Sequence, residues 1–236
     1  MKTGVFLQAR INSVRLKAKA LLPLRGTSTI QHVMRALLPV DADVHALLTD
    51  QESRELLSPY AEAEGFRLFA GPSDDVLLRY CRAAETYGVQ RIVRATGDNP
   101  LVSAEMANRI VEIHERKTAD LSHYLGLPLG TGVEVAQADA MWAAERAAAD
   151  PLEREHIMTH IYRHRDRFRV LEEPCPPQFS FPDVHVSLDT EDDYRFLSRI
   201  YRDLYEDGPI EIHSLARWLR ENEDLVRERR MEERGG

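Results

Sequence analysis

Apolar runs of strand length alternate with amphipathic stretches of helix length through the first half of the chain. The sequence predicts strands at residues 3–8, 44–49, 66–70 and 91–96. Helices are predicted between and after them, at 29–38, 52–64, 74–87 and 104–116. The helix ends carry residues that favour caps, namely Ser28 with Gln31 as a capping box, Gly65, Ser73, Gly88 and Ser103. Strands that alternate with helices of this length predict βαβ units and an α/β fold with a mainly parallel sheet flanked by helices.

The second half is less regular. Short strands are predicted at 121–124 and 132–135 around a turn-rich segment, and a further strand at 184–188. Asp150 followed by Pro151 predicts the start of a helix that runs to His164. Further helices are predicted after Thr190, to about residue 205, and at 214–222. We expect one domain over residues 1–225, with an inserted acceptor and dimerisation arm near 120–185 and a charged tail at 226–236.

Composition narrows the class of protein. The net charge of −8 argues against a general nucleic-acid binder, which would carry a basic excess. The two cysteines, Cys81 and Cys175, form neither a metal-binding spacing nor a disulfide framework. No stretch reaches the ~18 apolar residues of a membrane span, and the first residues do not resemble a signal peptide. A cytoplasmic protein without nucleic-acid or membrane partners is expected.

The first strand ends in a loop that is rich in cations. Arg10, Arg15, Lys17 and Lys19 follow it closely, and Ser13 adds a hydroxyl among them. Open α/β sheets bind ligands outside the carboxyl ends of their strands. A cationic loop at that place favours a polyanion such as a triphosphate, and the alternative is a solvated basic loop.

Two aspartates follow predicted strands elsewhere. Asp98 comes after the strand at 91–96, and Asp189 comes after the segment 184–188. Mg²⁺ takes one or two carboxylates together with phosphate oxygens and water, so this pair predicts a magnesium site. The alternatives are an Asx turn at Asp98 and a favourable helix-dipole contact at Asp189.

These features resemble a known family, the cytidylyltransferases that activate acidic sugars, and most closely the branch named after spore coat polysaccharide biosynthesis protein F. The matching segments occur in the family's order. They are Gln8-Ala9-Arg10 with Ser13, Arg15, Leu16 and Lys19; Leu22-Pro23-Leu24 with Gly26; Asp75-Val76-Leu77 with Arg79 and Tyr80; Ile92-Val93-Arg94 with Thr96-Gly97-Asp98 and Pro100-Leu101; Val133-Glu134-Val135; Arg154-Glu155-His156-Ile157; and Leu188-Asp189-Thr190 with Asp192-Asp193. The resemblance covers roughly residues 3–225.

The resemblance implies a nucleotide-diphospho-sugar transferase fold, a GT-A-like Rossmannoid arrangement, and a homodimer. It implies transfer of CMP from CTP to an acidic sugar or related anionic acceptor, with Mg²⁺ and release of pyrophosphate. The implied catalytic residues are Arg15, Lys19, Asp98 and Asp189, of which the two aspartates hold the metal. The implied nucleotide-binding residues are Gln8, Ala9, Arg10, Ser13, Ser73, Arg79, Thr96 and Gly97.

The chain departs from the family pattern at three places, of which the smallest is Asn99, where cysteine is frequent. Lys17 and Ala18 replace the usual Pro-Gly of the phosphate loop, and the segment Leu129–Glu134 lacks both aspartates of Asp-Gly-x-Asp-Val-Glu. That segment is expected to line the acceptor pocket. We expect Glu134, Arg154 and His156 to bind the acceptor, with the helix start near Arg154 holding an anionic group. The alternative is that Arg154 only pairs with Asp150 on an exposed helix face.

Other interpretations stay open. His156, His160 and His164 recur at helical spacing and could hold a transition metal, although a helix face with ordinary core contacts is favoured. A glycosyltransferase that uses a nucleotide-sugar would usually carry Asp-x-Asp, whereas Gly97-Asp98-Asn99 lacks the second aspartate. A catalytically weak nucleotide-binding protein of the same fold is the remaining alternative.

Overall fold

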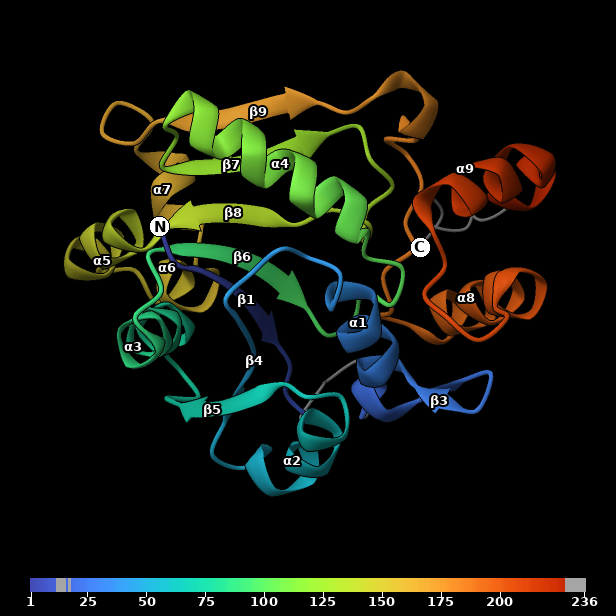
Figure 1. Ribbon diagram of the computed structural model, residues 1–236, viewed down its shortest axis with the longest axis horizontal. Helices are drawn as coiled ribbons and strands as arrows, with labels where there is room; N and C mark the ends of the chain where they lie inside the picture. Colours follow the sequence, from blue (N-terminus) through green and yellow to red (C-terminus); the bar gives the residue numbers. More distant parts are fainter. Residues whose placement is uncertain (12–15, 17, 228–236) are drawn as a thin grey trace.

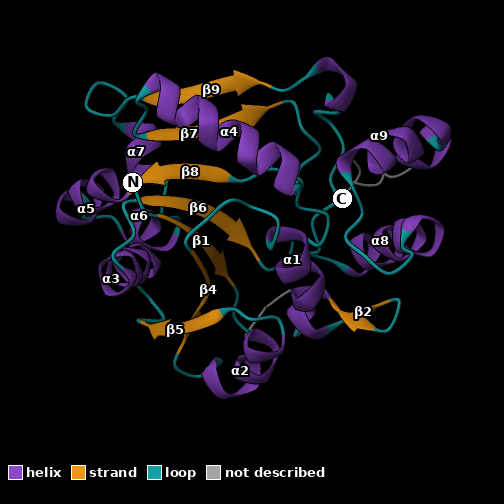
Figure 2. Ribbon diagram, in the orientation of Figure 1, coloured by secondary structure: helices purple, strands orange, loops and turns teal. Residues whose placement is uncertain are grey.

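The computed structural model describes residues 1–11, 16 and 18–227. A seven-stranded sheet in the order β5-β4-β1-β6-β8-β7-β9 forms its centre. The strands are β1 (Thr3–Gln8), β4 (Val44–Asp50), β5 (Arg67–Gly71), β6 (Arg91–Thr96), β7 (Leu121–Leu125), β8 (Glu134–Gln137) and β9 (Val170–Pro174). Only β8 runs antiparallel to its neighbours in this sheet. The predicted α/β fold with a mainly parallel sheet is confirmed (Figure 2).

Helices cover both faces of the sheet (Figure 1). They are α1 (Thr29–Leu37), α2 (Arg54–Ala63), α3 (Val76–Tyr87), α4 (Ala104–Lys117), α5 (Ala138–Ala147), α6 (Pro151–Glu155), α7 (Thr159–Arg163), α8 (Glu191–Leu204) and α9 (Ile212–Glu221). Short elements complete the description, namely η1 (Lys19–Leu21), β2 (Pro23–Leu24), β3 (Thr27–Ser28) and η2 (Pro177–Phe179). No helix of the described residues is long and apolar enough to cross a membrane.

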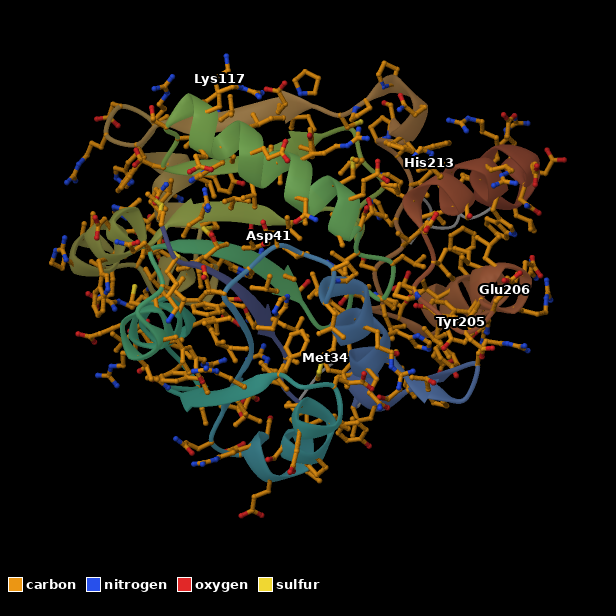
Figure 3. The ribbon with its side chains drawn as sticks, viewed as in Figure 1. Met34, Asp41, Lys117, Tyr205, Glu206 and His213 are labelled. Atoms are coloured by element: carbon orange, nitrogen blue, oxygen red, sulfur yellow. The ribbon has the colours of Figure 1, made fainter. Side chains whose placement is uncertain are left out.

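Two apolar cores lie on opposite faces of the sheet. One contains residues of α1, α2 and α4, and the other contains residues of α3, α5 and α7. Val5, Phe6 and Leu7 of the central strand β1 are fully buried because both faces are covered. In Figure 3, Met34 on α1 belongs to the first core and has no exposed surface, whereas Lys117 ends α4 at the exposed periphery. A third core joins α8 and α9 to Leu188.

Several predicted details are wrong for physical reasons. The segment 184–188 does not join the sheet and makes only a bridge between His185 and Leu129. The helix predicted from Asp150 to His164 divides into α6 and α7, because His156 leaves helical geometry at φ −99° and ψ 83°. Asp75, not Ser73, caps α3 by accepting a hydrogen bond from the Leu78 amide.

The capping box predicted at Ser28 is also not formed, because the Ser28 hydroxyl donates to the Gln31 side chain and accepts no backbone hydrogen bond. The segment near 120–185 contributes β7, β8 and β9, which extend the main sheet. Its role as an acceptor and dimerisation arm stays a prediction.

Gly130 is required where two loops pack backbone against backbone. Its φ is +103°, and a Cβ at this position would lie 2.8 Å from the Ser187 amide nitrogen. Leu129 and Val184–Val186 exchange backbone hydrogen bonds of 2.8 Å beside it. This contact fixes the segment that leads to Asp189.

We therefore expect Gly130→Ala to lower the free energy of unfolding by roughly 2 kcal/mol or more, because it adds a steric clash to backbone strain. Gly26→Ala is the matched control, since Gly26 has φ +83° but no atom within 4 Å of its added Cβ; it should cost only about 1–2 kcal/mol. Denaturant unfolding of both variants measures the difference. Equal losses would show that the close approach at Gly130 has no energetic effect.

Candidate active site

A cavity of about 430 Å³ opens at the carboxyl ends of β1 and β6. These parallel strands are neighbours, with Gln8 opposite Thr96, so the loops that follow them meet at one edge of the sheet (Figure 1). The predicted site residues that line the cavity are Gln8, Ala9, Arg10, Lys19, Thr96, Gly97, Asp98, His156 and Asp189. Ser13 and Arg15, together with Lys17, lie outside the described residues.

The two predicted metal-binding carboxylates converge on one ammonium group. Lys19 donates to Asp98 Oδ2 at 2.7 Å and to Asp189 Oδ1 at 2.8 Å. The three side chains are between a fifth and about a third exposed. Burial lowers the pKa of Lys19, but the two carboxylates together raise it, so the ammonium stays charged. Asp98 and Asp189, which lie 79 and 170 positions from Lys19 in the sequence, thus form one charged cluster with it in the cavity.

Backbone contacts hold this convergence in place. The Leu188 amide donates to the Asp98 carbonyl at 2.8 Å, which ties the loop after β6 to the segment before α8. The Asp193 carboxylate accepts from the amides of Asp189 and Thr190, while Thr190 accepts from the Asp193 amide. This capping box confirms the predicted Thr190 cap and fixes the backbone of Asp189.

The donor chemistry of the cluster fits a hard divalent cation. Two carboxylates already direct one oxygen each at a single cationic group, and the adjoining cavity leaves room for phosphate oxygens. Mg²⁺ prefers such oxygen ligands. Asp98 and Asp189 therefore suit the predicted metal, and a cation bound between them would compete with the contact that Lys19 makes in this structure.

The candidates for nucleotide binding fall into two groups. Gln8, Arg10 and Thr96 lie at the cavity, where the Gln8 Oε1 atom is buried and has no hydrogen-bond partner among the described residues. Arg10 is half exposed on the rim and contacts Glu155 at 3.4 Å. Gly97 packs closely against the loop after β1, because a Cβ at this position would lie 2.8 Å from the Ala9 Cβ, and the position therefore favours glycine.

The other nucleotide-binding candidates, Ser73 and Arg79, do not line this cavity. Arg79 is 1% exposed, and its guanidinium donates to the carbonyl oxygen of Pro72, with Nε at 2.9 Å. It thereby supports the turn before α3. Ser73 lines a separate hollow of about 420 Å³ together with Phe69. A contact of either residue with a nucleotide base stays a prediction.

The three candidates for acceptor binding are also separated. His156 lines the cavity directly. Glu134 instead accepts from Arg94 at 2.5 Å and from the Tyr162 hydroxyl at 2.7 Å. Arg154 does not line the cavity and does not pair with Asp150.

The Arg154 guanidinium bonds to Asp75 at 2.7 Å and to Glu145 at 3.1 Å. These contacts hold the capping residue of α3 and the end of α5 together, and they raise the pKa of Arg154. In this arrangement, Arg154 is a structural residue. An acceptor contact at Arg154 stays a prediction, and this structure does not favour it.

Arg94 lines the cavity and was not singled out from the sequence as a site residue. It lies on β6, between Val93 and Ala95, which are at most 3% exposed. A charged residue within a buried central strand is uncommon unless it is paired or functional. Its position within a buried strand was the sequence signal that pointed to Arg94. Leu16 and Ala20 also line the cavity, and neither is a residue type that indicates a functional role.

The histidine series does not form one face of a helix. His160 Nδ1 lies 2.7 Å from Glu153, and the His160 and His164 rings stack with centroids 4.1 Å apart. Potential ligand atoms of Glu153, His160 and His164 lie within 4.8 Å of one another. Arg163 also bonds to Glu153 at 3.0 Å, however, and His164 Nδ1 lies 2.8 Å from the His160 carbonyl oxygen, so two of these side chains already have other protein partners. This arrangement favours ordinary core contacts.

The similarity of the chain to known proteins agrees with this geometry. Residues 5–232 match the sequence model of the family described as Cytidylyltransferase. The spore coat polysaccharide biosynthesis protein SpsF of Bacillus subtilis (strain 168) is 30% identical over 94% of this chain and 96% of its own length.

Two solved structures share the fold. One is a cytidylyltransferase from Leptospira borgpetersenii serovar Hardjo-bovis, with a TM-score of 0.88 and 23% identity over 96% of this chain and 97% of that one. The other is CMP:2-keto-3-deoxy-manno-octonic acid synthetase complexed with CTP, with a TM-score of 0.65 and 13% identity over 86% of this chain and 99% of that one.

Ala18 adopts the left-handed conformation that glycine favours, with φ 50° and ψ 33° at the start of η1. We expect Ala18→Gly to raise the free energy of unfolding by roughly 0.5–1 kcal/mol, because it removes backbone strain. The matched control is Ala20→Gly, inside η1 and 3% exposed, which should lower it by about 1 kcal/mol. Thermal unfolding distinguishes the two, and a loss of stability in both variants would contradict the assignment of strain.

Lys19→Met should lower the free energy of unfolding by roughly 1–2 kcal/mol, because Asp98 and Asp189 then face each other without a counter-ion. Added Mg²⁺ or Mn²⁺ should restore most of this loss and raise the Tm of the variant more than that of the wild type. The control is the double variant Lys19→Met with Asp98→Asn, which should gain little from the cation. If divalent ions shift all three proteins equally, the carboxylates do not form a cation site.

Proposed function

The chain belongs to the cytidylyltransferase family, and we propose that it transfers CMP from CTP to an acidic sugar or related anionic hydroxyl compound, with release of pyrophosphate. The observation that carries this proposal is the convergence of Asp98 and Asp189 on Lys19 at the cavity. Carboxylates for a metal and a cation for phosphate are the groups that nucleotidyl transfer needs. The name of the Bacillus relative suggests that the product enters polysaccharide synthesis.

In the proposed reaction, the acceptor oxygen forms a bond to the α-phosphorus of CTP. The bond from that phosphorus to the oxygen bridging the β-phosphate breaks, so pyrophosphate leaves, and the acceptor proton passes to water. Asp98 and Asp189 would hold Mg²⁺, which supplies charge neutralisation at the phosphate oxygens when bound. Lys19 and Arg10 contribute further positive charge, and we assign the same role to Arg15.

The remaining cavity residues position the substrates. Gln8 and Thr96 lie side by side on adjacent strands and offer polar groups to the nucleotide. His156 enters the same cavity from the bend after α6 and is proposed to contact the acceptor. Catalysis in this scheme comes from positioning and electrostatics. We also propose, from the family resemblance, a homodimer formed through residues 120–185.

A panel of the four ribonucleoside triphosphates crossed with acidic sugars tests the proposal, with pyrophosphate release as the readout. We expect turnover with CTP and with at least one anionic sugar, and none with a preformed nucleotide-sugar as the donor. Turnover of a nucleotide-sugar without pyrophosphate would favour a glycosyltransferase. Binding of CTP without any turnover would favour a nucleotide-binding protein of the same fold.

Asp98→Asn and Asp189→Asn should each lower pyrophosphate release by about 100-fold or more, because each removes a charged metal ligand worth several kcal/mol in the transition state. Asp192→Asn is the matched control: Asp192 lies near Asp189 on the surface and bonds to Arg195 at 2.6 Å. Steady-state rates at saturating Mg²⁺, together with Tm values, measure the effect. Wild-type activity in either site variant would refute the assignment.

A further inference from the structure

Arg94 is a cation with unused hydrogen-bonding capacity in the candidate active site. Its guanidinium lines the cavity, and its side chain is 28% exposed. Its Nε atom is buried and has no hydrogen-bond partner among the residues that the structure describes. The same holds for Oε1 of Gln8, on the adjacent strand of the same cavity. Buried polar atoms without partners are uncommon and call for an explanation, such as an absent ligand.

A chain of polar side chains holds the Arg94 guanidinium in one orientation. Arg94 lies opposite Glu134 in the pairing of β6 with β8, and the two side chains are 2.5 Å apart. The Tyr162 hydroxyl donates to the other oxygen of Glu134 at 2.7 Å, and it lies 3.0 Å from His123 Nδ1. Glu134, Tyr162 and His123 come from β8, α7 and β7. The orientation of Arg94 therefore depends on three separate elements.

The charges around the cavity distinguish Arg94 from the other cations. Lys19 contacts two carboxylates, and Arg10 lies half exposed on the rim. Arg94 has one carboxylate partner, Glu134, which takes one of its five donors. Burial lowers the pKa of Arg94, but Glu134 and Tyr80 outweigh this effect and raise it, so the guanidinium is charged. A fixed guanidinium with spare donors suits bidentate binding of a carboxylate or phosphate group.

Arg94 lies nearer to β8 than to the predicted triphosphate contacts in the loop after β1. Its hydrogen-bonded carboxylate is Glu134 of β8, whereas Asp98, which also helps to raise the pKa of Arg94, accepts its hydrogen bond from Lys19. His156, a candidate for acceptor binding, lines the same cavity. An oxyanion on Arg94 therefore belongs to the second substrate more readily than to the β- and γ-phosphates.

We propose that Arg94 selects the acceptor by binding its anionic group, a carboxylate or phosphate, and that Glu134 and Tyr162 are positioning residues for Arg94. This inference rests on the proposed function and assigns to Arg94 the role that the sequence suggested for Arg154. It also explains how Glu134 contributes to acceptor binding, namely through the guanidinium that it orients.

The test uses the acceptor with the highest turnover in the panel and measures its KM, kcat and the Kd of CTP by calorimetry. Arg94→Gln should raise the acceptor KM about 10–100-fold, with the CTP Kd changed less than about twofold. Arg94→Lys should recover part of the loss, because it keeps the charge but not the planar pair of donors. Tyr162→Phe should raise the acceptor KM by a smaller factor, with the CTP Kd again unchanged.

Arg91→Gln is the matched control. Arg91 lies on the same strand, is 7% exposed and donates to Thr3 Oγ1 away from the cavity. It should lower the Tm without changing the acceptor KM. If Arg94 were purely structural, its variants would also lower the Tm without changing the acceptor KM, and that result would overturn the inference. Arg94→Lys and Tyr162→Phe give this answer even if Arg94→Gln folds poorly.

The remaining outcomes are also decisive. If Arg94→Gln weakens CTP binding as much as it raises the acceptor KM, the guanidinium binds the nucleotide phosphate and the inference is wrong. If the wild type releases no pyrophosphate with any anionic acceptor, the proposed function fails and this inference fails with it. The first result concerns a variant and the second the wild type, so the two failures are distinguishable.

Discussion

The shared ammonium group of Lys19 balances two carboxylates that would otherwise repel each other. Asp98 and Asp189 come from distant segments, and a backbone hydrogen bond from Leu188 to Asp98 brings those segments together. Two carboxylates that share one partner repel each other when both are charged, and the ammonium group between them offsets this repulsion. The charge distribution in the cavity depends on this contact between one ammonium and two carboxylates. The same two carboxylates are the candidates for holding a divalent cation.

The parallel sheet gives the cavity two chemically different sides. The loops after β1 and β6 present charged groups beyond the carboxyl ends of the strands, as expected for an open α/β sheet. Arg94 and Glu134 instead lie within adjacent strands, where a side chain is held by the sheet itself. Residues on strands are placed more rigidly than residues on loops. This difference suits one side to the polyanion of a triphosphate and the other to recognition of a smaller anionic group.

Some charged residues near the cavity serve the fold. Arg154 joins Asp75 and Glu145, and so connects the start of α3 with the end of α5. His160 and Arg163 both bond to Glu153, whose side chain is 8% exposed. A buried carboxylate needs such partners to offset its desolvation. Partners of this kind account for Arg154 and Arg163 without a ligand.

The sequence by itself determined the order of strands and helices in the first half, because apolar periodicity and capping residues are local signals. It also placed Lys19, Asp98 and Asp189 after predicted strands as candidate site residues, and the structure brings these three side chains together. The position of Arg94 within a buried strand was a sequence signal, but its partner Glu134 follows only from the pairing of β6 with β8, and the bend at His156 that divides α6 from α7 is visible only in the structure. Only the tertiary structure decided which cation each carboxylate holds: Asp75 engages Arg154, and Glu134 engages Arg94. The physical reason is that ion pairs and strand register are set by contacts between residues 40 to 170 positions apart, which a local pattern of polar and apolar residues does not record.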